Sequence, residues 1–157
     1  MKTCAFTGHR HLPSSLEKPL RALLSRGIAY VYSEGVRDFY AGGALGFDML
    51  AEEEVLRFRK ECSDVRLHLL LPHRGQAERW NFSEVRRYHR LLSEADSVTY
   101  LSDYYYDGVM RERNQALIDA ADVCIAYLTS GGGTAQTVAM AKRKGITVYN
   151  LKDGMKD

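Results

Sequence analysis

Three short segments carry the side chains best suited to binding chemistry. They are Thr7–Arg10 (TGHR), Ala41–Asp48 (AGGALGFD) and Ser130–Gln136 (SGGGTAQ). Each follows a short apolar run, so each is expected where a strand ends and a helix begins. Glycines let the backbone approach a ligand closely, and the free N–H groups at a helix start attract phosphate. Although neither glycine-rich loop fits the GxGxxG or Walker A pattern, the pair predicts a phosphate-bearing ligand.

Acidic, histidine and aromatic residues lie near these segments. Asp48 stands at a helix start, where it either caps the helix or bonds ribose hydroxyls. His9 and His11 have metal-ligand spacing, but no third ligand stands out, so we expect no metal site. Trp80 and the tyrosines at 104–106 fall in loops that follow strands. They either stack on a base or cover half-buried surface.

The elements that must position these residues alternate along the chain. Short apolar runs predict strands over 3–7, 38–41, 65–71, 97–101, 123–128 and 146–150. Helical spacing predicts helices over 16–31, 47–62, 81–94, 110–121 and from the 130–133 glycines to about 144. Strands separated by helices of ten or more residues indicate βαβ units. We therefore expect a three-layer α/β domain over 1–157, with a mostly parallel central sheet flanked by helices.

Two helices have an expected buried face. On the helix beginning at Phe47, the acidic residues Glu52 and Glu53 are expected to point away from the core, together with Arg57. On the helix over 81–94, the expected buried residues are Phe82, Val85, His89 and Leu92. The same helix carries a basic patch, either a solvated face or a nucleic-acid groove, formed by Arg86, Arg87 and Arg90.

Composition narrows the class of protein. The 157 residues are 45% hydrophobic and 27% charged, which is typical of a globular domain, and the net charge of +2 is too mild for a dedicated nucleic-acid binder. Cys4, Cys62 and Cys124 form no CxxC pair. The first strand begins at Thr3, and no apolar stretch reaches the roughly 20 residues of a membrane span. We therefore expect no signal peptide, no membrane contact and a reducing, cytoplasmic setting.

Several motifs resemble known families. Gly43–Asp48 (GALGFD) resembles the glycine-rich signature of the DNA-processing protein DprA (Smf). Met110–Asn114 (MRERN), followed by Ala121–Ala126 (ADVCIA) and Gly132–Thr134 (GGT), resembles the LOG proteins, phosphoribohydrolases that cut the base from nucleoside monophosphates. Both families belong to the SLOG superfamily of Rossmann-like folds. The opening TGHR segment is most similar to the small YpsA-like branch, as are four residues in the middle of the chain: Pro72, Gln76, Trp80 and Tyr88.

The sequence departs from the LOG pattern at one decisive position. The catalytic glutamate of that motif falls at Thr137, beside Gln136, and neither side chain can ionise. The LOG catalytic arginine matches Arg113, which suits phosphate or ribose binding. If the chain is an enzyme, the catalytic candidates are Arg113, Asp48 and Glu112, and Glu112 is also explained as an exposed helical residue.

The residues and the resemblance together predict a cytoplasmic nucleotide-binding protein that requires no cofactor. The ligand is expected to be a nucleoside phosphate or a derivative of the ADP-ribose or NAD type. The alternatives are a LOG-type N-glycosidase and DprA-like binding of single-stranded DNA, and self-association is also possible. The expected ligand-binding residues are Gly8, His9, Arg10, Gly42, Gly43, Gly46, Asp48, Trp80, Arg113, Gly131, Gly132, Gly133 and Thr134.

Overall fold

The computed structural model describes residues 2–155 and shows one parallel sheet of six strands in the order β4-β3-β2-β1-β5-β6. The strands are β1 (Thr3–Gly8), β2 (Asp38–Ala41), β3 (Arg66–His73), β4 (Ser97–Ser102), β5 (Val123–Tyr127) and β6 (Thr147–Asn150). Every neighbouring pair is parallel, from Thr3 opposite Asp38 to Ala126 opposite Asn150. The predicted α/β class is confirmed, and the sheet is parallel throughout.

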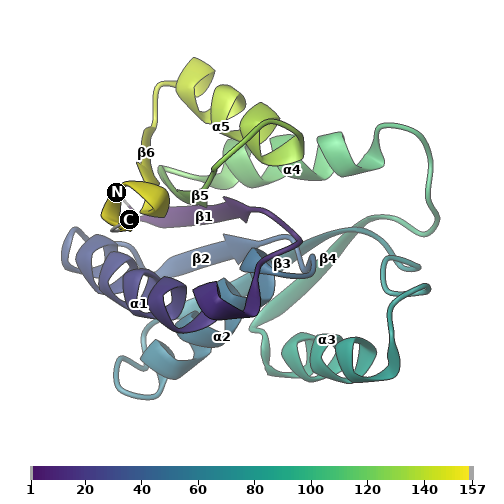
Figure 1. The fold of residues 1–157 in the computed structure, drawn as a ribbon, viewed down its shortest axis with the longest axis horizontal. Coiled ribbons are helices and arrows are strands. Elements are labelled where there is room, and N and C mark those ends of the chain that lie inside the picture. Colours follow the sequence, from purple (N-terminus) through teal and green to yellow (C-terminus); the bar gives the residue numbers. More distant parts are fainter. Residues whose placement is uncertain (1, 156–157) are drawn as a thin grey trace.

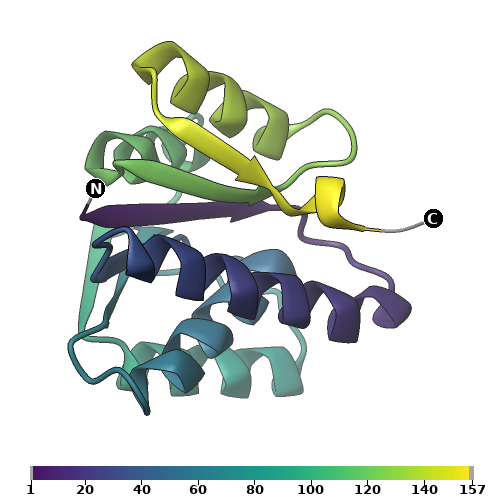
Figure 2. The same ribbon diagram turned by 90° about the vertical axis from the view of Figure 1, so that its left-hand side faces the viewer.

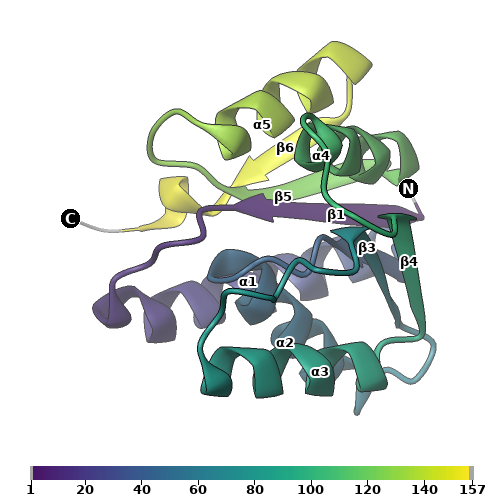
Figure 3. The same ribbon diagram turned by 90° about the vertical axis from the view of Figure 1, so that its right-hand side faces the viewer.

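Five α-helices cover the two faces of the sheet. They are α1 (Glu17–Ser33), α2 (Phe47–Arg59), α3 (Phe82–Glu94), α4 (Val109–Ala120) and α5 (Gly133–Lys144). Two 3₁₀ turns, at Ser14–Leu16 and Leu151–Gly154, complete the described chain. Helices α1, α2 and α3 lie on one face, and α4 and α5 lie on the other (Figures 1, 2 and 3). The expected three layers are therefore present.

The strand order creates a crevice beside β1. The chain steps outward from β1 to β4, and α4 then carries it back across the sheet to β5, on the other side of β1. The connections that leave β1 and β5 consequently run to opposite faces. In open α/β sheets, ligands bind at such a switch in strand order, outside the carboxyl ends of the strands. All five residues of β5 are buried, as expected for a central strand.

The core fixes how the first loops pack. The ring of Phe6 stacks on Phe39 with centroids 5.9 Å apart and contacts the edge of Phe47 at 6.4 Å. Phe47 is the first residue of α2, so this contact anchors the start of that helix beneath β1. A Cβ atom on Gly8 would lie only 2.3 Å from the Phe47 ring. Only glycine fits at the end of β1 without moving Phe47.

Two predicted helix faces are wrong, and several element ends differ from the prediction by one to three residues, the largest difference being that α2 ends at Arg59 rather than at residue 62. Glu52 is buried, with 1% exposure, because its carboxylate bonds a loop amide. In α3, Tyr88 and Leu91 are the buried residues, whereas the predicted Phe82 is 78% exposed.

The predicted His89 in α3 is also exposed, and Val85 and Leu92 are only partly buried. The buried face of α3 thus lies about one position away from the expected one, and the helix begins at a capping box formed by Asn81 and Glu84.

Strand β3 continues through Pro72 to His73, past its predicted end at Leu71. The missing N–H of Pro72 is tolerated because the last β2 pair is Ala41 with Leu69, so β3 has only β4 beside it there.

None of the helices in residues 2–155 combines the length and the apolar character that crossing a membrane requires.

Candidate functional site

A cavity of about 520 Å³ opens at the predicted switch point. Most of the expected ligand-binding residues line it: Gly8, His9, Arg10, Asp48, Arg113, Gly131, Gly132, Gly133 and Thr134. The cavity also exposes side chains that were not predicted to bind ligand: Met110, Arg111, Asn114 and Gln136. All four lie in the MRERN and SGGGTAQ segments, in which other residues were predicted to bind ligand. The volume lies within the range of small-molecule sites.

Arg113 is a buried cation at this cavity. Arg113 is only 4% exposed. It donates from Nη1 to the Gly42 carbonyl (2.6 Å) and from Nε to Asn114 Oδ1 (2.9 Å). Among residues 2–155, no carboxylate forms an ion pair with it. Burial lowers the pKa of Arg113, which means that the environment disfavours its charge. A cation held in this way favours an incoming anion.

Two buried carboxylates face the loop that follows β2. Asp48 Oδ2 accepts the Ala44 N–H (3.2 Å), and Glu52 Oε2, one helical turn further along α2, accepts the Gly43 N–H (3.1 Å). Burial raises the pKa of both groups, and for Asp48 attraction to Arg113 offsets part of the rise. Asp48 does not cap α2, whose N-cap residue is Gly46. Of these acids, only Asp48 lines the cavity.

The remaining glycines predicted in this loop lie behind the cavity wall. The Gly43 carbonyl accepts from Gln76 Nε2 (3.1 Å), and Gly42 is held by Arg113, so the loop supports the arginine. Gly46 has φ +75°, and a Cβ there would lie 2.3 Å from the Arg10 carbonyl oxygen. This close approach fixes the segment that carries Arg10. None of these three glycines lines the cavity.

His9 connects the loops after β1 and β5. Its Nε2 accepts the Thr129 N–H at 2.9 Å, so this nitrogen is unprotonated in the arrangement shown. The Phe47 N–H donates to the His9 carbonyl (3.1 Å), which holds the same loop against α2. Within the described chain, no three His, Cys, Asp or Glu side chains gather as metal ligands. His9 thus lines the cavity and also links the loops that follow β1 and β5.

The loop before α5 is the most open part of the site. A Cβ added at Gly131, Gly132 or Gly133 would meet nothing within 4 Å. In residues 2–155, the N–H groups of these glycines have no hydrogen-bond acceptor. Gly131 and Gly132 precede α5 and Gly133 is its first residue, so all three lie where unpaired amides and the helix dipole attract anions. Thr137, at the position of the LOG glutamate, is fully buried and donates to the Gly133 carbonyl (2.8 Å).

Two other predicted residues lie away from the cavity. Glu112 is exposed, and its carboxylate accepts a hydrogen bond from the Tyr106 hydroxyl. Trp80 packs edge-on against Tyr88, with centroids 5.1 Å apart, at the margin of the hydrophobic core. Neither side chain lines the cavity. Arg113 and Asp48 are thus the two catalytic candidates that the fold brings together.

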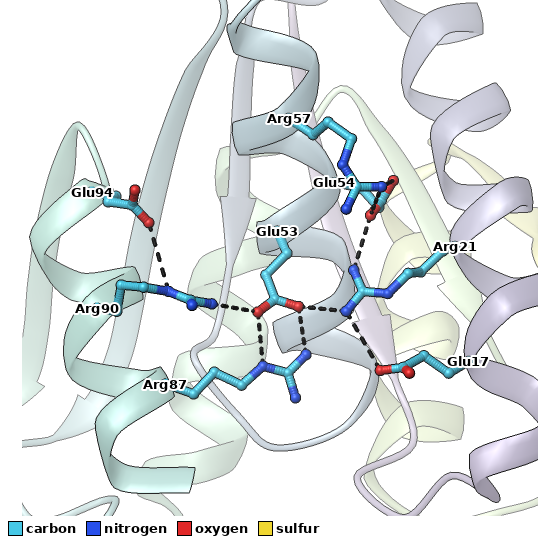
Figure 4. Close-up of polar contacts among 8 residues, drawn as sticks. All are labelled: Glu17, Arg21, Glu53, Glu54, Arg57, Arg87, Arg90 and Glu94. Atoms are coloured by element: carbon cyan, nitrogen blue, oxygen red, sulfur yellow. Dashed lines mark hydrogen bonds and ion pairs between the residues drawn. The ribbon is translucent and has the colours of Figure 1, made fainter. Parts of the chain in front are cut away.

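The basic patch on α3 is paired rather than free (Figure 4). Glu53 of α2 accepts from Arg87 Nε (2.8 Å) and Arg90 Nη2 (2.8 Å) on one side, and from Arg21 Nη2 (2.7 Å) of α1 on the other. The third member of the patch, Arg86, lies over the exposed Phe82 ring. Glu53 was expected to point to solvent, but it joins three helices through these arginines.

Comparisons with known proteins agree with this architecture. A UPF0398 protein of Staphylococcus haemolyticus is 25% identical over 80% of this chain and 72% of its own length. A UPF0398 protein of Bacillus cereus is 26% identical, covering 92% and 85%.

Among solved structures, DNA processing protein A from Helicobacter pylori, described for its single-stranded DNA binding mode, superposes with a TM-score of 0.60 and 23% identity. The match covers 94% of this chain but only 63% of the Helicobacter chain. The protein TM1055 matches with a TM-score of 0.59 and 20% identity, covering 98% and 79%. These two likenesses establish the fold.

The family is shown by a sequence model. The YpsA model, described as the YspA SLOG family, matches residues 14–150. This range includes both glycine-rich loops and the segment that carries Arg113. The resemblance to the YpsA-like branch is therefore confirmed, and the chain belongs to the YspA SLOG family.

Proposed function

We propose that the protein binds a nucleoside phosphate, or a derivative of the ADP-ribose or NAD type, in the cavity between α4 and α5. The observation that carries this proposal is Arg113, which is 4% exposed, lines the 520 Å³ cavity and forms no ion pair within residues 2–155. Burying a charge is costly unless it is paired. The guanidinium is hydrogen-bonded to Gly42 and Asn114 and attracted by Asp48 at longer range, but no carboxylate of the described chain pairs with it directly. An anionic ligand would supply the missing partner.

The rest of the site supports a phosphate with a sugar attached. The open amides of Gly131–Gly133 at the start of α5 provide hydrogen-bond donors for phosphate oxygens. Arg10, on the facing loop, adds a second positive charge. Asp48 is the one acid among the cavity-lining residues of the described chain, and its carboxyl oxygens can accept from ribose hydroxyls. In this proposal, phosphate and ribose are recognised in one cavity.

The test is binding of AMP, NAD and ADP-ribose by isothermal titration calorimetry. Arg113→Ala should weaken the affinity at least tenfold, because charge-assisted hydrogen bonds contribute about 1.5–3 kcal/mol. Arg113→Lys retains the positive charge and serves as a control for a folding defect in Arg113→Ala. Arg143→Ala is the matched control, because Arg143 is exposed at the opposite end of α5. Unchanged affinity in a folded Arg113→Ala variant would remove this residue from the site.

A second candidate function, hydrolysis of the N-glycosidic bond, is favoured by Asp48. Asp48 lines the cavity, and burial raises the pKa of its carboxyl. As the C–N bond breaks, this carboxyl can give a proton to the departing base and then recover one from the water that adds to the sugar carbon. The same samples, followed overnight by proton NMR, distinguish the two functions. Free adenine or nicotinamide that disappears in Asp48→Asn would indicate turnover, whereas binding without new signals indicates a binding module.

We also propose that the protein works in a reducing, cytoplasmic compartment. Its three cysteines are free, and two of them, Cys4 and Cys124, are buried in adjacent strands. Burial raises the pKa of both thiols, which keeps them unreactive.

The proposed partner is a small nucleotide. Self-association and single-stranded DNA binding remain alternatives that solution measurements can separate.

A further inference from the structure

Gln76 is one of the four residues in the middle of the chain that carry the resemblance to the YpsA-like branch, and the proposed function uses none of them. It lies in the loop between β3 and α3, shortly after the end of β3. Its backbone N–H donates to the His73 carbonyl (3.3 Å), which forms a turn at the carboxyl end of that strand. Arg113 reaches the same end of the sheet from α4, on the face opposite α3 (Figure 1).

The Gln76 amide joins two parts of the site. Its Nε2 donates to the Gly43 carbonyl (3.1 Å), and its Oε1 accepts a long hydrogen bond from Arg113 Nη1 (3.5 Å). The same Nη1 donates to the Gly42 carbonyl (2.6 Å). One side chain from the loop after β3 thus contacts both the glycine loop after β2 and the guanidinium that this loop supports.

The packing behind the amide restricts where it can lie. Gly43 has φ +70°, and a Cβ there would lie 3.3 Å from Gln76 Nε2 and 2.3 Å from the Leu71 side chain. Because Gly43 has no side chain, the amide can approach the loop backbone. The Tyr88 ring, 3.5 Å from the same Cβ position, is 4% exposed and packs edge-on against Trp80. Two other residues of the same group therefore pack beside the loop that Gln76 holds.

The oxygens that accept from Arg113 within residues 2–155 are all neutral. They belong to the Gly42 carbonyl, the Asn114 side chain (2.9 Å) and the Gln76 side chain. A neutral oxygen orients a guanidinium and leaves its positive charge available, whereas a carboxylate at the same place would form an ion pair with it. An amide at position 76 is therefore suited to hold Arg113 for an anionic ligand.

We propose that Gln76 is a positioning residue for Arg113, which sets the direction of the guanidinium and preserves its charge for the ligand. This inference rests on the proposed function, in which Arg113 binds the anionic group of a nucleotide. Gln76 does not line the cavity. It therefore acts through Arg113 and not by touching the ligand.

Two substitutions of similar size separate orientation from charge, with ADP-ribose as the probe. Gln76→Met removes both hydrogen bonds, so the affinity should fall about 2- to 12-fold, which corresponds to one net hydrogen bond. Gln76→Glu also loses the bond to Gly43 but places a carboxylate beside Arg113, so at neutral pH the affinity should fall about tenfold further.

The pH dependence of these losses reports the charge directly, because the pyrophosphate of ADP-ribose does not change its charge near neutral pH. The extra loss in Gln76→Glu should shrink as the pH falls toward about 4.3, the ordinary pKa of glutamate, since the introduced carboxyl then gains a proton. The ratio of the wild-type affinity to the Gln76→Met affinity should not depend on pH.

A second measurement needs no ligand. The NMR signals of the Arg113 guanidinium in isotope-labelled protein, identified by their loss in Arg113→Ala, should broaden in Gln76→Met, because the group can then change its orientation. Gln115 provides the matched controls, since it is an exposed glutamine of α4 that bonds Asp119 and lies outside the cavity lining. Gln115→Met and Gln115→Glu should change neither the signals nor the affinity.

The outcomes distinguish the positioning role from the proposed function. Unchanged guanidinium signals in Gln76→Met would overturn the positioning role, whichever ligand binds. Equal affinity losses in Gln76→Met and Gln76→Glu at every pH would overturn the preservation of charge and would leave a packing role alone. If the signals broaden but the wild-type protein binds none of AMP, NAD and ADP-ribose, Gln76 positions Arg113 and the proposed function fails.

Discussion

At the residue scale, the unexpected feature is the buried acid Glu52. It lies one turn from Asp48, accepts the Gly43 N–H and has no cation within ion-pair distance in the described chain. Burial, with a smaller contribution from Asp48, raises its pKa well above the usual value. A carboxyl whose pKa rises on folding stabilises the protein below its unfolded pKa, and this contribution is lost as the pH rises through the folded value.

Glu52→Gln should therefore change the pH dependence of stability in a definite direction. The amide keeps an acceptor for the Gly43 N–H but never ionises. Relative to wild type, the variant's free energy of unfolding should rise as the pH increases above about 4.3, the ordinary pKa of glutamate. Urea unfolding at several pH values measures this difference. Glu52→Ala, which leaves the amide unpaired, should be about 1–3 kcal/mol less stable than Glu52→Gln at all pH values. A constant offset for Glu52→Gln would show that folding leaves the pKa of Glu52 unchanged.

At the element scale, Glu53 joins α1, α2 and α3 through Arg21, Arg87 and Arg90 (Figure 4). Burial alone would raise the pKa of Glu53, but the hydrogen bonds from Arg87 and Arg21 outweigh it and lower the pKa. The stabilisation is present above the unfolded pKa and is lost as the pH falls through the folded value.

Glu53→Gln should lower the free energy of unfolding by about 1–3 kcal/mol near neutral pH, with a smaller loss in acid, where wild-type Glu53 is protonated. Thermal and urea unfolding check this expectation. Glu94→Gln is the control, since Glu94 is 51% exposed and makes a single 3.9 Å ion pair with Arg90. Equal effects of the two substitutions would mean that Glu53 acts as an ordinary surface charge.

The elements also show what the sequence could predict. Apolar runs located the strands well, because a strand buried on both faces, such as β5, is apolar at each position. Helical spacing located the helices but not every buried face. Glu52 violates the rule that acids face solvent, since its partner is a backbone amide whose position depends on the fold. The cavity was predictable from the loops. The ion pairs of Glu53 were not, because they depend on how three helices pack together.

At the scale of the whole molecule, the charge distribution favours a small nucleotide over a nucleic-acid strand as the ligand. The net charge is only +2, and Glu53 pairs with two of the three arginines of the α3 patch. Three basic side chains line the cavity: Arg10, Arg111 and Arg113. A site of this size can engage about one to three phosphates.

We therefore expect any binding of single-stranded DNA to depend weakly on salt. Each phosphate contact on a single strand contributes about −0.7 to the slope of log K against log salt, so three contacts give a slope of about −2. Fluorescence anisotropy with an oligothymidine, measured between about 50 and 200 mM salt, gives this slope. Excess AMP should displace the strand, because under the proposed function both would bind at Arg113. A slope steeper than about −4, or binding that AMP does not compete with, would require phosphate contacts beyond the cavity and would favour a DNA-binding role.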